Sequence, residues 1–126
     1  MALCPTPGEQ EPPSGQGDPR YLKFFQQFNQ EAFFEAHETL EILWRETYSE
    51  ERDFYQALIQ TAAACVHLQK GNLEGAEVLH AKVEKLFSRY PKPHLGVDTE
   101  DLLAQLQKAL QHSQNFPKIT PLKTNQ

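Results

Sequence analysis

The sequence predicts an all-α fold: a compact antiparallel bundle of about five helices behind a disordered N-terminal leader. Apolar residues recur at steps of three and four through residues 20–113, as they do along one face of an α-helix. No segment shows the sustained apolar/polar alternation and β-branched enrichment that are typical of strands. The links between successive amphipathic segments are short, which favours antiparallel neighbours and therefore a bundle.

Three parts are expected along the chain. Residues 1–19 contain five of the nine prolines and three of the six glycines, so they cannot bury enough apolar surface to offset the entropy of ordering. We expect this segment to be a disordered leader. Residues 20–113 form the helical domain, and residues 114–126, which contain Pro117 and Pro121, form an irregular tail that runs over the surface.

The first three helices follow from apolar spacing and from turn residues. Aromatic side chains repeat at helical steps from Tyr21 and predict a short helix that closes near Asn29. A second helix follows and ends near Thr47, before a turn rich in polar residues. The third helix runs from about Glu51 to Gln69 and is apolar around most of its circumference, which indicates the most enclosed position in the bundle.

The last two helices are marked by capping residues. Gly71 ends the third helix, and Asn72 is suited to cap a fourth, which the Pro-Lys-Pro sequence at 91–93 stops. Asp98 can cap a fifth helix. Its apolar stripe consists of Leu102, Leu103, Leu106, Ala109 and Leu110.

The charge distribution excludes one class of partner. The net charge is −5, so the chain lacks the basic footprint of a nucleic-acid-binding protein. Residues 30–53 hold eight acidic side chains against two arginines, whereas residues 54–126 hold eight basic side chains against six acidic ones. The two regions are expected to attract one another, either within one fold or across a homodimer.

The cysteines and the apolar runs bear on cellular location. Cys4 in the leader and Cys65 in an apolar helix form a poor disulfide pair and match no metal spacing, so a reducing cytoplasm is the simplest setting. The N-terminus has no apolar signal region, and no run in the chain is long enough to span a bilayer. We therefore predict a cytoplasmic protein with no membrane association.

The second helix places two ionisable side chains among its apolar ones. With His37 as reference, Trp44 lies about 20° away and Glu41 about 40° away on the other side, while Phe33, Leu40 and Phe34 fall within roughly 60°. His37 and Glu41 are thus expected inside the apolar stripe, with Glu38 about 100° away at its border. A buried carboxylate without partners costs several kcal/mol, so Glu41 needs a hydrogen bond, an ion pair, a metal ion or a proton.

The third helix offers partners for these groups. Gln56, Gln60 and His67 are spaced by four and seven residues and form one narrow polar stripe beside Ala63 and Ala64. If this stripe faces the second helix, the polar side chains meet in one buried cluster. The sequence therefore predicts a partly enclosed ligand pocket between the two helices, lined by His37, Glu38, Glu41, Trp44, Gln56, Gln60 and His67.

Two motifs in these helices carry a resemblance to a known family. The pattern aromatic-x-x-His-Glu-x-x-Glu-x-x-Trp is present in FNQEAFFEAHETLEILW, residues 28–44, and a Leu-Ile-Gln helix leading to a Gly-Asn-x-x-Gly-Ala turn is present in YQALIQTAAACVHLQKGNLEGAEVL, residues 55–79. Over roughly residues 21–110 the chain resembles the domain of unknown function family 309. The resemblance implies an all-helical bundle and no established activity. The matching positions are His37, Glu38, Glu41, Trp44, Gln60, Asn72 and Gly75.

Several functions are compatible with the polar cluster. It can be a satisfied network that fixes helix register, or a metal site in which His37, Glu41 and His67 bind a divalent cation, or an acid/base pair that needs no metal. Residues 69–91 also resemble half of a tetratricopeptide unit, but no second copy follows at the required spacing. We predict a ligand- or partner-binding domain of unknown cofactor, with a metal-dependent hydrolase-like enzyme as the alternative.

Overall fold

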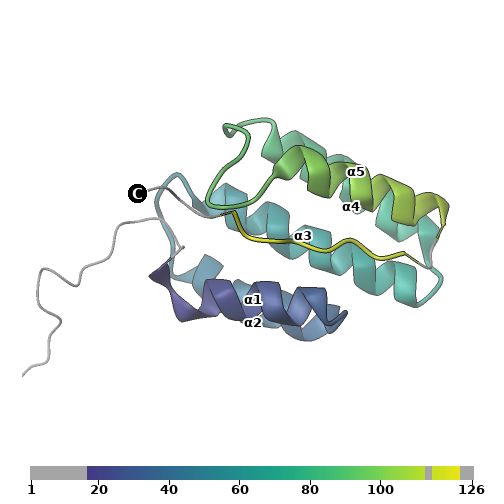
Figure 1. Cartoon of the computed structure of the whole chain (residues 1–126), viewed down its shortest axis with the longest axis horizontal. Helices are drawn as coiled ribbons and strands as arrows, with labels where there is room; N and C mark the ends of the chain where they lie inside the picture. The colour runs from purple at the N-terminus through teal and green to yellow at the C-terminus, as the bar shows by residue number, and fades with distance from the viewer. Residues whose placement is uncertain (1–16, 113–114, 123–126) are drawn as a thin grey trace, which may run out of the picture.

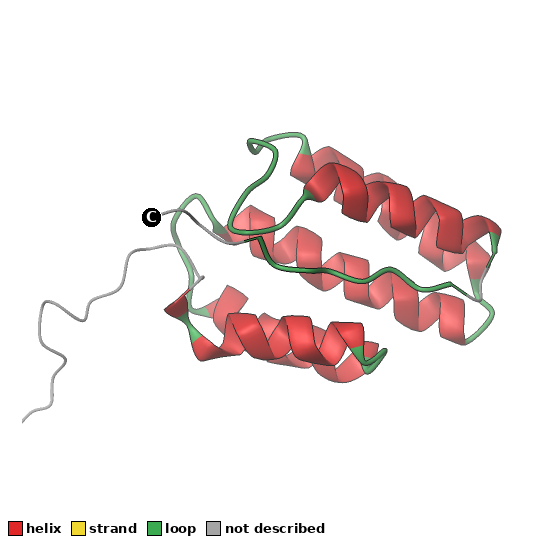
Figure 2. Ribbon diagram, in the orientation of Figure 1, coloured by secondary structure: helices red, strands yellow, loops and turns green. Residues whose placement is uncertain are grey.

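The computed structural model describes residues 17–112 and 115–122 and confirms the all-α bundle. The predicted leader lies outside the described residues up to position 16, as do the tail positions 114 and 123–126. Across the described ranges there are five helices and, in place of strands, one isolated bridge between His94 and Val97 (Figures 1 and 2). The helices are α1 (Pro19–Asn29), α2 (Phe33–Arg45), α3 (Arg52–Gln69), α4 (Leu73–Phe87) and α5 (Thr99–Gln111).

The helix α3 is the centre of the bundle. It packs against α2 on one side and α4 on the other, while α1 packs on α2 and α5 packs on α4 (Figure 1). Ten of its residues are buried, in agreement with the enclosed position that its apolar circumference predicts. None of the helices in the described part of the chain combines the length and the apolar character needed to cross a bilayer.

Side-chain caps set the starts of three helices. The carboxylate of Asp18 accepts the Arg20 N–H at 2.8 Å, and Asp98 accepts the Asp101 N–H at 3.1 Å. At α4, Asn72 Oδ1 accepts the Gly75 N–H at 3.0 Å. Each cap satisfies a backbone donor that has no partner inside the first turn of its helix. The first helix therefore begins at Pro19, slightly earlier than its aromatic spacing predicts.

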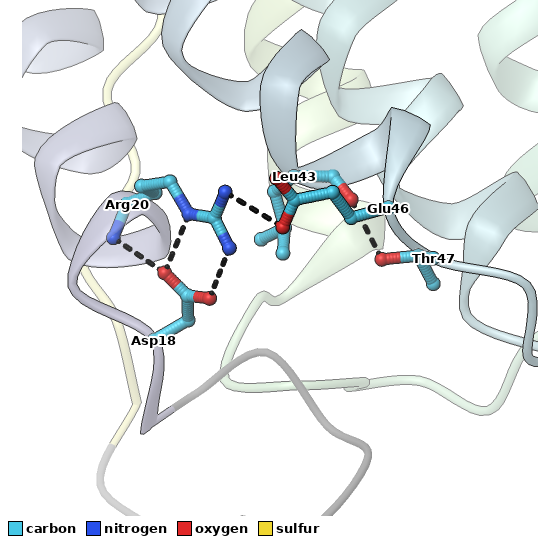
Figure 3. Close-up of polar contacts among 5 residues, drawn as sticks. All are labelled: Asp18, Arg20, Leu43, Glu46 and Thr47. Carbon is cyan, nitrogen blue, oxygen red and sulfur yellow. Dashed lines mark hydrogen bonds and ion pairs between the residues drawn. The ribbon is translucent and has the colours of Figure 1, made fainter. Parts of the chain in front are cut away.

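A charged cluster joins the start of α1 to the end of α2 (Figure 3). The Arg20 guanidinium donates to Asp18 Oδ2 at 2.8 Å and lies 3.0 Å from Glu46 Oε1. The hydrogen bonds from Arg20 favour the charged carboxylate, so they lower the pKa of Asp18 below its ordinary value. Nearby, the Thr47 hydroxyl donates to the Leu43 carbonyl at 2.7 Å, which closes the last turn of α2.

The core is rich in aromatic rings contributed by α1. Phe28 contacts Phe33 at the start of α2 with ring centroids 5.0 Å apart, and Phe33 in turn lies 5.4 Å from Phe116 of the C-terminal segment. Both distances fall in the range of favourable aromatic pairs. The aromatic residues whose spacing predicts α1 thus also supply much of what α2 packs on. The buried residues of α1 are Tyr21, Phe24, Phe25 and Phe28.

The acidic segment 30–53 pairs with basic residues of the same chain. Asp53 lies 2.6 Å from Arg89, Glu51 lies 2.7 Å from His94, and Glu31 lies 3.3 Å from Lys118. The predicted attraction between the two regions therefore operates within the fold. The surface pairs add little stability, because solvent screens them and long side chains lose entropy when held. The homodimer stays a prediction.

The C-terminal segment, residues 115–122, differs from the expected surface tail. It is irregular, as predicted, but it runs along the bundle between α1 and α5 (Figure 1). Ile119 is 3% exposed, and Pro117 is buried as well. The prolines prevent a helix but not burial. Successive side chains of an extended segment point to opposite sides, so every second one can insert into a groove between helices.

Candidate functional site

The apolar stripe of α2 proves to have an inner and an outer part. Phe33 and Leu40 are buried, Trp44 is half-buried, and Phe34 is 55% exposed. Measured from His37, Phe33 and Leu40 lie on one side, while Phe34 and Glu41 lie on the other at roughly 60° and 40°. The core takes the first side, so His37 stands at the boundary of the buried face. The expectation that Phe34 and Glu41 turn inward is corrected accordingly.

A pocket of about 160 Å³ lies between α2 and α3 at this boundary. Phe34 supplies an exposed ring at its rim, and that ring lies nearly parallel to the His37 imidazole, with centroids 6.2 Å apart and planes inclined by 12°. The structure therefore brings together His37 and His67, two of the predicted pocket residues. The pocket is lined by Phe34, His37, Ala63, Val66 and His67.

The His67 ring is held by the cap of the next helix. Its Nδ1 lies 3.0 Å from Asn72 Nδ2, while the oxygen of the same amide accepts the Gly75 N–H. An amide nitrogen can only donate, so Nδ1 of His67 accepts and the ring proton of the neutral imidazole sits on Nε2. The second nitrogen of His67 is thus a hydrogen-bond donor. Gly75 makes this contact fit, because a Cβ there would lie 2.6 Å from Asn72 Nδ2.

Helices α2 and α3 pack against each other along a contact that we call the α2–α3 seam. Three buried polar atoms of these two helices lack a hydrogen-bond partner within the described ranges. They are the buried Nδ1 of His37, Nε1 of Trp44 and Oε1 of Gln60. Leaving such an atom unpaired costs about 1–3 kcal/mol, and most buried polar groups in folded proteins are paired. Of these three residues, His37 lines the pocket. The predicted satisfied network between these side chains is not among the hydrogen bonds of the described residues.

The far end of the seam is closed by an arginine. The Arg52 guanidinium lies 4.2 Å from the centre of the Trp44 ring and 5.3 Å from that of Tyr48, and its Nη1 donates to the Thr47 carbonyl at 3.3 Å. This cation–π contact shields the face of the Trp44 indole from solvent. Gln56 is half-buried on the same stripe of α3. The open part of the seam is therefore its His37/His67 end.

The two predicted acidic members lie on the outer side of α2. The Glu41 side chain is 32% exposed and pairs with Arg45 at 3.4 Å, one turn along the same helix. Glu38 is exposed. Helix geometry explains both positions, since each lies on the side of His37 away from the core. The carboxylate of Glu41 thus forms an ion pair at the surface, where water can supply most of its hydrogen bonds.

The predicted metal site is not assembled. No three histidine, cysteine, aspartate or glutamate side chains within residues 17–112 and 115–122 are grouped so that they could hold a metal ion. His37 and His67 line one pocket, but Glu41 is directed to Arg45. A catalytic zinc site requires three protein ligands that converge on one point, and this triad does not provide them.

An imidazole that the sequence places only in a loop forms a well-defined contact. His94 Nε2 lies 2.7 Å from Glu51 Oε1, and the ring packs against Phe54 and Tyr90 with centroids 4.7 Å and 4.9 Å away. The pair fixes the loop between α4 and α5 to the start of α3. The sequence carries one signal for this contact, which is that the basic end of α4 could attract the acidic start of α3. The spacing of residues does not predict where a loop side chain such as His94 lies.

One comparison with known proteins finds a family that part of the chain resembles. Residues 21–79 match the family described as Domain of unknown function (DUF309). The match covers α2, α3 and nearly all of α1 and ends inside α4, so it is shorter than the segment 21–110 suggested by the motifs. No curated protein matches the chain. The pocket, formed by α2 and α3, lies wholly within the matched segment. Residues 21–79 of this chain are thus similar to the DUF309 family, over a segment that includes both motifs.

Proposed function

We propose that this protein is a partner-binding domain whose α2–α3 pocket receives a single ring-bearing side chain from another protein. The observation that carries the proposal is the exposed Phe34 ring, which lies stacked beside the His37 imidazole at one pocket. Exposed aromatic side chains beside a pocket are typical of binding hot spots.

The volume of the pocket favours a side chain over a larger ligand. Sites for drug-sized molecules and cofactors usually measure about 300–1,000 Å³, and this one measures about 160 Å³. A space of that size suits one ring. A nucleotide or an extended organic cofactor would lie mostly in solvent.

A phenol ring has the chemistry that the pocket can use. The Nδ1 of His37 is buried in the free protein, so a hydroxyl would reach it only after the imidazole rotates, and the hydroxyl could then serve either tautomer as donor or acceptor. Nε2 of His67 offers a donor to the same group, while Ala63 and Val66 provide an apolar wall. The partner side chain that best fits these features is tyrosine.

The experiment is an NMR titration of the full chain with p-cresol, the analogue of the tyrosine side chain. Saturable chemical-shift changes are expected at the lining residues, with a dissociation constant in the millimolar range, which is about −4 kcal/mol of binding free energy. Toluene, which lacks the hydroxyl, should bind more weakly. The absence of saturable shifts at the lining residues with p-cresol would contradict the proposal.

Matched variants separate pocket binding from surface adsorption. Ala63→Leu should fill the pocket and abolish the shifts. Ala81→Leu, which adds the same side chain at an exposed position of α4, should leave them unchanged. Equal loss in both variants would indicate non-specific adsorption instead of a site.

A further inference from the structure

The C-terminal segment is held chiefly through its main chain. Asn29 of α1 uses its side-chain amide to donate to the Ile119 carbonyl and to accept the Ile119 N–H, both at 2.7 Å. Gln105 of α5 does the same to Lys118, donating to its carbonyl at 2.9 Å and accepting its N–H at 2.8 Å. Farther along, the Leu122 N–H donates to the Gly96 carbonyl at 2.8 Å.

The two amides match the geometry of an extended peptide. Backbone N–H and C=O groups of successive residues in an extended chain point to opposite edges. Lys118 is bound from α5, and Ile119 is bound from α1, on the other edge. Because these bonds engage backbone groups only, any extended segment without proline at these two positions could form them. The channel between α1 and α5 therefore has the construction of a peptide-binding groove.

Beside the buried Pro117, two further side chains of the segment give this channel selectivity. Ile119 is buried to 3% exposure, so an aliphatic side chain is required at that position. The Lys118 ammonium donates to the Asn29 carbonyl at 3.0 Å and lies 3.3 Å from the Glu31 carboxylate, so a cation is favoured at the preceding position. The preferred ligand is thus an extended segment with a basic residue followed by an aliphatic one.

We propose that the channel between α1 and α5 recognises an extended basic–aliphatic segment of a partner protein, and that residues 115–122 occupy it in competition with that partner. Charge supports this choice of occupant. The acidic segment 30–53 begins beside the channel with Glu31, which would attract a basic peptide. Recognition here adds a strand-like ligand by main-chain bonding, with two adjacent side-chain positions for specificity.

Competition has a measurable consequence. If the tethered segment occupies the channel at least about nine-tenths of the time, a free peptide binds at least about tenfold more weakly than it would to an open channel. Replacing Ile119 by aspartate should expel the tethered segment, because a buried carboxylate without a partner is strongly disfavoured.

The test is a titration of the full chain with a synthetic peptide of the sequence NFPKITPL, residues 115–122. The full-length Ile119→Asp variant should bind this peptide at least about tenfold more tightly than the wild-type chain does. Adding Asn29→Ala to that variant should abolish the gain, since it removes both bonds to the isoleucine backbone. Failure of a folded Ile119→Asp variant to bind the peptide would overturn the proposal.

A second measurement uses the wild-type chain and remains decisive if the variant does not fold. In native-state hydrogen exchange, the amides of Lys118 and Ile119 should exchange through a local opening more frequent than the opening of α3 amides. Equal protection of the segment and α3 would mean that the segment leaves only on global unfolding, which overturns the proposal. Light scattering reports the oligomeric state of the chain. A dimer that becomes a monomer in the Ile119→Asp variant would also overturn the proposal, in favour of a second copy as occupant.

Discussion

At the level of single residues, burial decides the chemistry of the one cysteine within the described ranges. Cys65 is free and fully buried in α3. Burial disfavours the charged thiolate and raises the pKa of the thiol far above its ordinary value. The thiolate is the reactive form of cysteine, so the folded protein should keep this side chain inert.

The reactivity of Cys65 can be measured with a thiol-labelling reagent in a Cys4→Ser background, which leaves one cysteine in the chain. We expect negligible labelling near neutral pH in native buffer and complete labelling in denaturant, because a thiol whose pKa is raised stays protonated there. Rapid labelling of a chain that keeps its native tertiary signals would contradict the burial of Cys65.

Individual positions on α2 also show why the surroundings of His37 were predicted only in part. Its place near the apolar stripe follows from helical spacing, but spacing gives angles without saying which side of the residue meets the core. Packing on α1 and α3 selects the side of Phe33 and Leu40, so Glu41 and Phe34 turn outward. A helix with apolar residues on both sides of a polar one leaves that choice to tertiary contacts.

At the level of elements, the turn between α3 and α4 couples a cap to the pocket. Asn72 bonds the Gly75 N–H with its oxygen and His67 with its nitrogen. Gly71 precedes it with φ of 77°, a left-handed conformation that glycine adopts without strain. One side-chain amide thus caps α4 and orients an imidazole of α3. The sequence motifs contain both residues, but they do not predict that the two side chains are in contact.

Gly75→Ala tests this coupling. The new Cβ would displace the Asn72 amide and cost about 1 kcal/mol of unfolding free energy through loss of the cap, outweighing the better helix propensity of alanine. The measurement is chemical denaturation of the full chain.

The matching control for this prediction is a double-mutant cycle with Asn72→Ala. Once the cap is gone, Gly75→Ala should cost much less, because the displaced amide is no longer there. Additive effects of the two substitutions would show that the cost arises elsewhere in the turn.

Across the whole molecule, stability rests on the aromatic contacts that join α1 to α2 and α2 to the C-terminal segment. Phe28→Ala should lower the unfolding free energy by about 3–5 kcal/mol, because it opens a cavity in the centre of these contacts. Phe34→Ala makes the same change at a ring that is 55% exposed, and it should cost less than about 1 kcal/mol.

Thermal and chemical denaturation of the two variants, side by side, check this prediction. The comparison holds the chemistry of the substitution constant and changes only burial. A loss of similar size in both would contradict the assignment of Phe34 to the outer side of α2.

The helices, the caps at Asn72 and Asp98, and the all-α bundle could be predicted from the chain alone, because apolar spacing and capping chemistry act over a few residues. The two histidines of the pocket could be named in the same way. Folding in three dimensions was needed to turn Glu41 away from the core, to pair His94 with Glu51, and to lay the C-terminal segment between α1 and α5. These contacts depend on packing directions and on residues far apart in the chain, which no local pattern encodes.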